Sequence, residues 1–320
     1  MTDQAYLCLD NISKSFPLKE GTWIKTTAWL RAVNRVSLTI YRGETVGLVG
    51  ESGCGKSTLG RIACGLDKPS QGEVTLAGEK ISSSTDLLKS RKIQMIFQDP
   101  FSSLNPRQKI GSIISESLRI HKMGSKKEIL DKTSSLMEKV GLSPAHMSRY
   151  PHEFSGGQRQ RIAIARAISL DPDMVICDEP VSALDVSVQA QILKLLKRLQ
   201  QDLNLSYLFI SHDLSVVKYL CSRIVVMYLG ELVEIAGKNQ LYHNPAHPYT
   251  RALLAAVPTP DPGIKSKTLV VRSEPPNPLS PPSGCRFHPR CPEKMEICSQ
   301  KEPEWTTVSS NQSVRCFLYE

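Results

Sequence analysis

Residues 50–58 read Gly50-Glu51-Ser52-Gly53-Cys54-Gly55-Lys56-Ser57-Thr58, and this run fits the phosphate-loop pattern G-x-x-x-x-G-K-[ST]. Residues 45–49 before it are apolar and β-prone, and residues 59–64 after it resemble the opening of a helix. Strand, loop and helix in this order are the context that the pattern requires. In such a loop the backbone N–H groups wrap phosphates, Lys56 reaches the β and γ phosphates, and the Ser57 hydroxyl takes one Mg²⁺ position.

The composition is that of a globular protein with a sizeable core, because 40% of the 320 residues are hydrophobic and 22% are charged. Residues 1–10 show no basic segment followed by an apolar one, and no apolar run is long enough to span a bilayer. We therefore expect a protein that is neither secreted nor membrane-spanning. The formal charge of +9 would suit nucleic acid or an anionic lipid surface, but the basic residues are scattered, which favours an ordinary solvated surface.

Strand and helix patterns alternate along the chain and predict an α/β fold. The pattern predicts an edge strand at residues 5–16, a polar interruption at 18–30 and a resumed strand at 33–40. A helical insertion is expected from Ile110 to Val140, with a break at Gly124-Ser125. Further strands are expected at residues 72–77, 93–97, 174–177, 207–210 and 223–236, and further helices at 159–170 and from Ser187.

Polar side chains follow three of the predicted buried strands. Gln98 follows residues 93–97, Asp178 and Glu179 follow 174–177, and His212 follows 207–210. Two carboxylates at a strand end are costly unless a metal or a reacting group needs them. Asp178 would hold Mg²⁺, and Glu179 would orient and deprotonate a water. A lone Gln or His at such a position would otherwise be a surface or capping residue, whereas here Gln98 can touch Mg²⁺ or the water and His212 can donate to a γ-phosphate.

A second anion site is expected where Ser155-Gly156-Gly157-Gln158 opens a helix. Ser155 is a good N-cap and the glycines leave backbone donors open, although an ordinary capped helix would read the same way. Phe16 could stack on a nucleotide base or plug the core, and its sequence context alone favours the core.

Six sites in this order resemble the ATP-binding subunits of ABC transporters. They are the phosphate loop at 50–58, Gln98, the signature Phe154-Ser155-Gly156-Gly157-Gln158, the Asp178-Glu179 pair, the D-loop Ser182-Ala183-Leu184-Asp185 and the switch histidine His212. Phe154 stands where the family usually has Leu, which keeps the position apolar. The resemblance implies a P-loop ATPase core with an antiparallel β subdomain and a helical subdomain. It also places Phe16 at the family's adenine-stacking position, which reverses the preference for a core role.

Further segments narrow the resemblance to peptide importers, and within these to the F-type ATPase subunit of dipeptide and oligopeptide transporters. They are Asn105-Pro106-Arg107, the run at 154–166, residues 244–249 and the tail at 284–292. We expect an ATPase domain at 1–240, with its helical subdomain at about 99–170, and a C-terminal extension at 241–320. A related importer of nickel, glutathione or another solute is the alternative, followed by a soluble ABC ATPase acting on nucleic acid or ribosomes. The latter usually has two cassettes or a long coiled coil. A GTPase is disfavoured because no Asn-Lys-x-Asp occurs.

The resemblance implies that ATP lies between two ATPase subunits. Lys56, Ser57, Gln98, Asp178, Glu179 and His212 would serve the chain's own nucleotide, whereas Ser155, Gly156 and Gly157 would contact the γ-phosphate of the partner's. The implied partners are a second homologous ATPase subunit, two transmembrane permease subunits and, indirectly, an extracytoplasmic peptide-binding protein, with no nucleic acid. The implied location is peripheral, on the cytoplasmic face of the bacterial inner membrane.

Nine cysteines without an export signal indicate reduced thiols or metal ligands. Four of them, Cys285, Cys291, Cys298 and Cys316, lie in a Pro-rich tail that is too poor in apolar residues to fold on a core of its own. Small segments of this kind usually need a disulfide or a bound metal to be stable. Their spacing does not fit the C-x₂-C pairs of common zinc sites. By resemblance they suit a [4Fe–4S] cluster, with zinc, free thiols or a disulfide as the alternatives.

Overall fold

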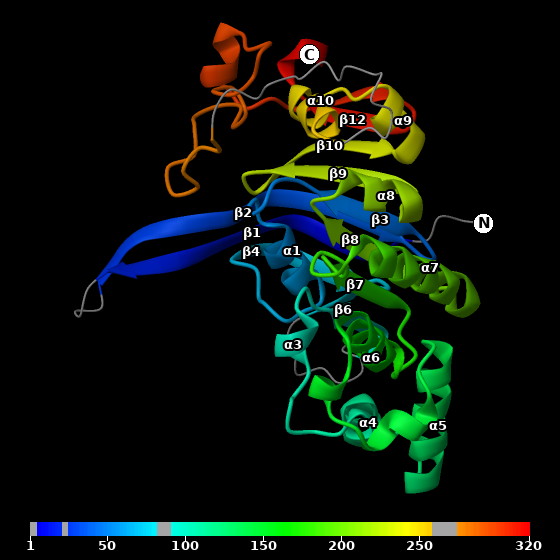
Figure 1. Cartoon of the computed structure of the whole chain (residues 1–320). Coiled ribbons are helices and arrows are strands. Elements are labelled where there is room, and N and C mark those ends of the chain that lie inside the picture. Colours follow the sequence, from blue (N-terminus) through cyan, green and yellow to red (C-terminus); the bar gives the residue numbers. More distant parts are fainter. Residues whose placement is uncertain (1–4, 21–24, 82–90, 258–273) are drawn as a thin grey trace.

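The centre of the molecule is a mixed eight-stranded sheet. The structure, a computed structural model, describes residues 5–20, 25–81, 91–257 and 274–320. The strands of this sheet are β3 (Thr45–Val49), β6 (Ile93–Ile96), β7 (Met174–Asp178), β8 (Ser206–Ser211), β9 (Arg223–Tyr228), β10 (Glu231–Gly237), β11 (Trp305–Ser309) and β12 (Gln312–Arg315). Their order is β11-β12-β10-β9-β3-β8-β7-β6 (Figure 1).

Strands β6, β7, β8, β3 and β9 pair in parallel. Every residue of β3, β7 and β8 is buried, as expected for parallel strands that are covered on both faces. One face packs against α1 (Lys56–Ala63) and the second sheet, and the other against α7 (Val186–Leu203) and α8 (Leu214–Leu220). Because parallel strands end at one edge, the segments that follow β3, β6, β7 and β8 are brought together there.

A second, antiparallel sheet has the order β2-β1-β4-β5. Its strands are β1 (Ala5–Glu20), β2 (Lys25–Tyr41), β4 (Gln71–Leu76) and β5 (Glu79–Lys80). Two expectations are wrong here: β1 lies between β2 and β4 instead of at an edge, and the polar stretch 18–30 continues both strands as a long hairpin, apart from residues 21–24, which lie outside the described residues. Pairs such as Phe16 with Leu30 satisfy the backbone of both strands, so polar side chains do not end the ladder.

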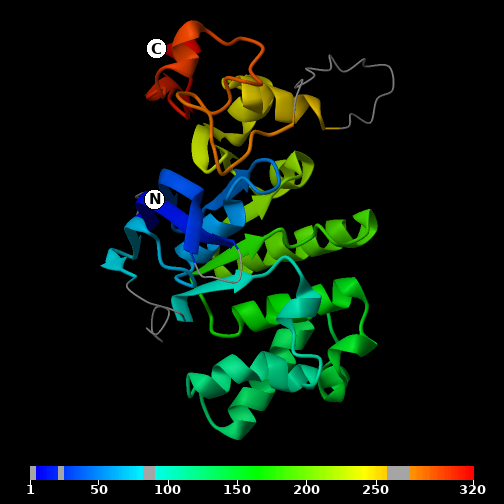
Figure 2. The ribbon, with the colours of Figure 1, turned by 90° about the vertical axis from the view of Figure 1, so that its left-hand side faces the viewer.

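A group of helices lies at one end of the molecule (Figures 1 and 2). It contains α3 (Pro100–Ser103), α4 (Ile110–Ile120), α5 (Lys126–Lys139), the 3₁₀ turns Pro144–Ser148 and Pro151–Glu153, and α6 (Gly156–Ile168). The predicted break near Gly124-Ser125 is confirmed: Ser125 caps α5, accepting a hydrogen bond from the Glu128 N–H while the Glu128 carboxylate accepts one from the Ser125 N–H.

The opposite end holds α9 (Lys238–His243), α10 (Pro248–Ala255), the 3₁₀ turns Glu296–Ser299 and Phe317–Tyr319, and the β11–β12 hairpin (Figure 2). Strand β12 pairs with β10, so this C-terminal part continues the central sheet. The fully buried Glu234 carboxylate of β10 accepts hydrogen bonds from the Ala246 and His247 N–H groups and from Gln312 Nε2. Among the described residues, no helix is both long and apolar enough to cross a membrane.

Candidate active site

The phosphate loop connects β3 to α1, as the sequence predicts, although the helix begins at Lys56, earlier than expected. Gly50 and Gly55 have φ angles of 157° and 105°, and a Cβ at either would lie 2.1 Å from a backbone carbonyl oxygen, of Met227 or Ala32. Gly53, at φ 76°, faces open space. The loop thus needs glycine where it packs and stays open at Gly53, where a phosphate can approach the backbone.

Lys56 is buried at the start of α1 and turns back over the loop. Its Nζ donates to the carbonyl oxygens of Gly50, at 2.8 Å, and Glu51, at 2.9 Å. The helix N-cap, Gly55, offers no side-chain cap, so the first N–H groups of α1 lack a capping side chain. A positive charge beside open backbone donors fits the phosphates of a nucleotide.

Two side chains with oxygen atoms that could bind a metal ion meet beside the phosphate loop. Ser57 Oγ donates to Asp178 Oδ1 at 2.9 Å, which joins the first turn of α1 to the end of β7. Burial raises the pKa of Asp178, and the Ser57 hydrogen bond opposes that rise. A hydroxyl and a carboxylate form a hard donor set that fits Mg²⁺, whose charge would favour the ionised carboxylate.

Three predicted catalytic residues meet at one oxygen atom, Glu179 Oε2. Gln98 Nε2 donates to it at 3.1 Å, and His212 Nδ1 lies 3.0 Å from it. Glu179 has a φ of 45°, a conformation uncommon for a residue with a side chain, and its side chain is 12% exposed, against 55% for His212. A carboxylate held in this way can accept a proton from a water that approaches from the exposed side.

The signature segment forms the start of α6, which is capped by its own residues. Ser155 Oγ accepts from the Gln158 N–H and Gln158 Oε1 accepts from the Ser155 N–H. A Cβ at Gly157 would lie 2.4 Å from Val188 Cγ1 of α7, so glycine is needed there for packing, whereas Gly156 has only the Leu184 side chain at 3.3 Å. Ser155 is exposed and Gly156 is half-buried, whereas Gly157 is buried, so solvent reaches the helix start at Ser155 and Gly156.

The remaining predicted residues make no contact with the side chains of Asp178 or Glu179 that is described above. Phe16 is half-buried in β1 with Lys14 Nζ 5.2 Å from its ring centre. Asp185 is exposed at the N-cap position of α7, without a side-chain capping bond, and Thr58 is half-buried in the first turn of α1. Ser52 is exposed and Cys54 is buried beside Lys56. No contact places Phe16 or Asp185 on a nucleotide, and their roles stay predictions.

The four late cysteines line one small cavity of about 10 Å³. All four are free thiols, and burial raises the pKa values of Cys285 to about 12 and Cys316 to about 11. Within the described ranges, no group of three or more His, Cys, Asp or Glu side chains is arranged to hold a metal ion. A metal centre would therefore require these thiols to change their arrangement.

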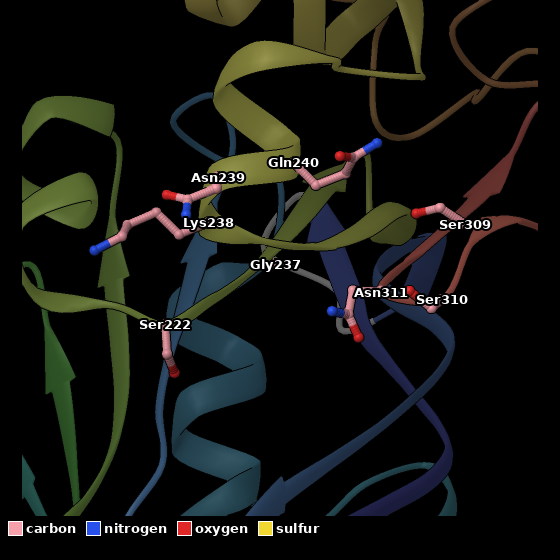
Figure 3. Close-up of a pocket in the computed structure, with 8 residues that line it drawn as sticks. All are labelled: Ser222, Gly237, Lys238, Asn239, Gln240, Ser309, Ser310 and Asn311. Carbon is pink, nitrogen blue, oxygen red and sulfur yellow. The ribbon is translucent and has the colours of Figure 1, made fainter.

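A separate open pocket of about 550 Å³ lies between the β10–α9 junction and the turn of the β11–β12 hairpin (Figure 3). Lys238 is its one charged lining residue, and none of the six sequence motifs contributes to it. It is therefore no part of the phosphate site. Closer to the motifs, a cleft of about 460 Å³ lies between loop residues 51–54 and the Pro-rich residues 274–278.

Comparison with known proteins identifies the family. A family model described as ABC transporter matches residues 33–182, and one described as the C-terminal region of oligopeptide/dipeptide transporters matches residues 233–298. The chain is 48% identical over 322 residues to the oligopeptide transport ATP-binding protein AppF of Bacillus subtilis, an alignment that covers 99% of this chain and 98% of AppF. The chain belongs to the ABC transporter ATP-binding family.

Further relatives and solved structures support the same family assignment. This ABC ATPase is 48% identical over 309 residues to the dipeptide transport ATP-binding protein DppF of Haemophilus influenzae, which covers 96% of this chain and 94% of DppF. It resembles the dimeric, ADP- and Pi-bound ATP-binding cassette MJ0796 with a TM-score of 0.63 and 29% identity, over 72% of this chain and 98% of that one. It also resembles CbiO1 of Clostridium perfringens with a TM-score of 0.64 and 25% identity, over 75% of this chain and 92% of that one. The predicted fold class is confirmed, and the protein is an ATP hydrolase that uses ATP and Mg²⁺.

Two residues to which the sequence assigned no role touch the phosphate loop. Tyr249 of α10 and Arg290 of the C-terminal part both bind Glu51. Glu51 and Arg290 are 239 positions apart, and no local pattern could have joined them.

Proposed function

We propose that this ABC ATPase powers the import of dipeptides or oligopeptides through a membrane permease. The observation that carries the proposal is the similarity to relatives named for peptide transport, which continues through the C-terminal part beyond the generic cassette. A related importer of nickel, glutathione or another small solute is the alternative, since specificity resides in the permease and the binding protein.

The test is uptake of labelled di-, tri- and longer peptides, with nickel and glutathione as comparison solutes, in cells that carry Glu179→Gln or the wild-type chain. Loss of peptide uptake alone supports the proposal and ranks peptide length. Loss of nickel or glutathione uptake with intact peptide uptake would overturn it. Because a homologous ATPase could substitute, the assay is run in cells that lack other peptide-importer ATPases.

The residue roles are part of the proposal. Lys56 and the loop N–H groups bind the phosphates, Ser57 and Asp178 hold Mg²⁺, and Glu179 deprotonates the attacking water. Gln98 and His212 orient Glu179 and the water, and His212 can also donate to the γ-phosphate. The hydrogen bonds that join Ser57 to Asp178, and Gln98 to Glu179, support this division of labour, as does the short distance from His212 to Glu179.

ATP is proposed to lie between this chain and a second ATPase subunit. The γ-phosphate of the ATP that is bound to the second subunit would face the start of α6. Ser155, Gly156 and Gly157 would supply donors to it, and Gln158 would cap the helix. The solvent-accessible helix start and the dimeric state of the MJ0796 cassette support this arrangement. Two permease subunits would receive the region from Gln98 to Arg107 and the helical group, on the cytoplasmic face of the bacterial inner membrane. An extracytoplasmic binding protein would deliver the peptide.

The cysteine cavity is proposed to hold a metal centre only after its thiols rearrange. Four thiols that line one cavity suit either a [4Fe–4S] cluster or zinc once deprotonated, while the burial that raises the pKa values of Cys285, Cys291 and Cys316 favours neutral thiols at these three positions in the metal-free chain. Iron, sulfide and zinc are measured in protein purified without oxygen. Four irons and four sulfides per chain support the cluster; zinc alone or no metal removes it.

A further inference from the structure

The C-terminal part binds the phosphate loop through the side chain of one loop residue. Arg290 donates to both carboxylate oxygens of Glu51, from Nη1 to Oε2 at 2.8 Å and from Nη2 to Oε1 at 2.9 Å. The Arg290 side chain is 6% exposed and that of Glu51 is 28% exposed. A two-point ion pair that is largely shielded from water fixes both distance and orientation, which a surface ion pair does not.

A second contact reaches the backbone of the same residue. Tyr249 Oη accepts a hydrogen bond from the Glu51 N–H at 2.8 Å. The Tyr249 ring is buried, with its centre 4.6 Å from that of Tyr228 and 5.4 Å from that of Phe287. Packing on two aromatic rings holds the phenol in place, so this contact fixes where the Glu51 N–H points.

Glu51 also touches the phosphate-binding lysine, because its carbonyl oxygen accepts from Lys56 Nζ at 2.9 Å. Its amide, side chain and carbonyl are therefore held by Tyr249, Arg290 and Lys56 respectively. This makes a continuous set of contacts from the C-terminal part to the lysine that meets the phosphates.

We propose that Arg290 and Tyr249 are positioning residues for nucleotide binding. They hold the phosphate loop in its binding shape through Glu51, and Arg290 also neutralises a carboxylate that would otherwise repel the phosphates. A loop held in its bound conformation loses less conformational entropy when the nucleotide binds. An unpaired carboxylate beside a polyphosphate raises the electrostatic cost of binding.

The competing view is that the Arg290–Glu51 pair only fastens the C-terminal part to the core. Other contacts also join these two parts: Arg286 Nε lies 2.9 Å from Glu231 Oε1 in a nearly buried pair, and Arg35 pairs with Glu302 at the surface. The Arg35–Glu302 pair joins the same two parts without touching the loop, which makes Arg35→Ala a matched control.

The test is the affinity of the full-length chain for MgADP, measured by titration calorimetry. Arg290→Ala is expected to weaken binding about tenfold, within the range of couplings between contacting residues. Arg290→Lys keeps the charge without the two-point geometry, so its affinity for MgADP should lie between those of the wild type and Arg290→Ala. Tyr249→Phe, which removes only the acceptor for the Glu51 N–H, should weaken binding about threefold. Arg35→Ala should bind as the wild type does. Thermal melting of each variant reports whether the C-terminal part stays folded.

The double variant Glu51→Gln/Arg290→Ala separates charge neutralisation from positioning, because both variants lose the two-point contact but only Arg290→Ala leaves an unpaired carboxylate. If Arg290 neutralises Glu51, the double variant should bind MgADP more tightly than Arg290→Ala alone. Equal losses in the two variants would overturn the neutralisation and leave positioning as the cause. The whole proposal is overturned if Arg290→Ala binds MgADP as Arg35→Ala does.

Discussion

The edge where β3, β6, β7 and β8 end differs from the start of α6, although both carry motifs for the same reaction. At the edge, residues from four segments already touch: Ser57 binds Asp178, and Gln98 and His212 meet at Glu179. At the start of α6, Ser155 and Gln158 bind each other, and Ser155 faces outward. The residues proposed to serve the chain's own nucleotide are thus joined within the chain, and those proposed to serve a second chain's nucleotide stand apart.

In the proposed arrangement, closure of the two ATPase subunits would depend on ATP. A helix N-terminus attracts an anion, so bringing α6 against a γ-phosphate would stabilise the closed pair only while that phosphate is present. Substitutions in either region should therefore change phosphate release or nucleotide binding by different amounts.

Glu179→Gln should have the largest effect on the edge. The amide cannot accept a proton, so phosphate release should fall at least about a hundredfold, as expected for a lost general base, while MgATP binding is retained. Phosphate release and nucleotide titration measure the two quantities. Glu73→Gln, which alters an exposed carboxylate that pairs with Lys80, is the control. Unchanged phosphate release by Glu179→Gln would remove Glu179 as the base.

Gly156→Asp tests the start of α6 without harming the helix. An acid in the first turn is favourable for a helix, and the Cβ meets only a side-chain end, Leu184 Cδ2 at 3.3 Å. The added carboxylate would repel a γ-phosphate, so hydrolysis should fall about a hundredfold while MgADP still binds the chain's own phosphate loop. Gly156→Ala, which adds the Cβ without charge, should keep most of the activity. Equal losses in both variants would indicate packing instead of charge.

His212→Ala should slow phosphate release about tenfold, less than Glu179→Gln, because it removes a neighbour of the base and leaves the base itself. His212→Gln, which can still donate a hydrogen bond, should recover part of the rate. A loss as large as that of Glu179→Gln would mean that His212 itself is the essential residue.

Phe16→Ala should have the smallest effect. Loss of a stacking face should weaken ATP binding about fivefold, at the low end for base–aromatic contacts, and leave the rate at saturating ATP unchanged. Phe16→Tyr keeps the face and should bind as the wild type does. Wild-type affinity in Phe16→Ala would return Phe16 to a core role.

Local chemistry explains which features the sequence could predict. The phosphate loop, the break between two helices at Gly124-Ser125 and the acid pair after β7 depend on neighbouring residues or on the rule that parallel strands end together. The sequence predicts the start of α1 at residue 59, whereas the helix begins at Lys56, directly after Gly55 in a left-handed conformation.

Distant pairing explains what the sequence did not predict. The long β1–β2 hairpin depends on partners such as Phe16 and Leu30, and its polar side chains hide the strand period. The central position of β1 depends on β4, far along the chain. The Arg290–Glu51 pair likewise joins residues whose local sequences say nothing about each other. The domain boundary near residue 240 stays a prediction, because β12 continues the same sheet as β10.

The most direct test of the proposed role of α6 is the sedimentation of the Glu179→Gln chain, alone and mixed with the homologous ATPase subunit of the same transporter, at saturating nucleotide, with MgATP or MgADP. Paired ATPase subunits are expected with MgATP, single chains with MgADP, and single chains with both nucleotides when Gly156→Asp is added. Single chains with MgATP at protein concentrations up to the solubility limit, or pairs that form equally with Gly156→Asp, would contradict the claim that the start of α6 binds the nucleotide of a second subunit.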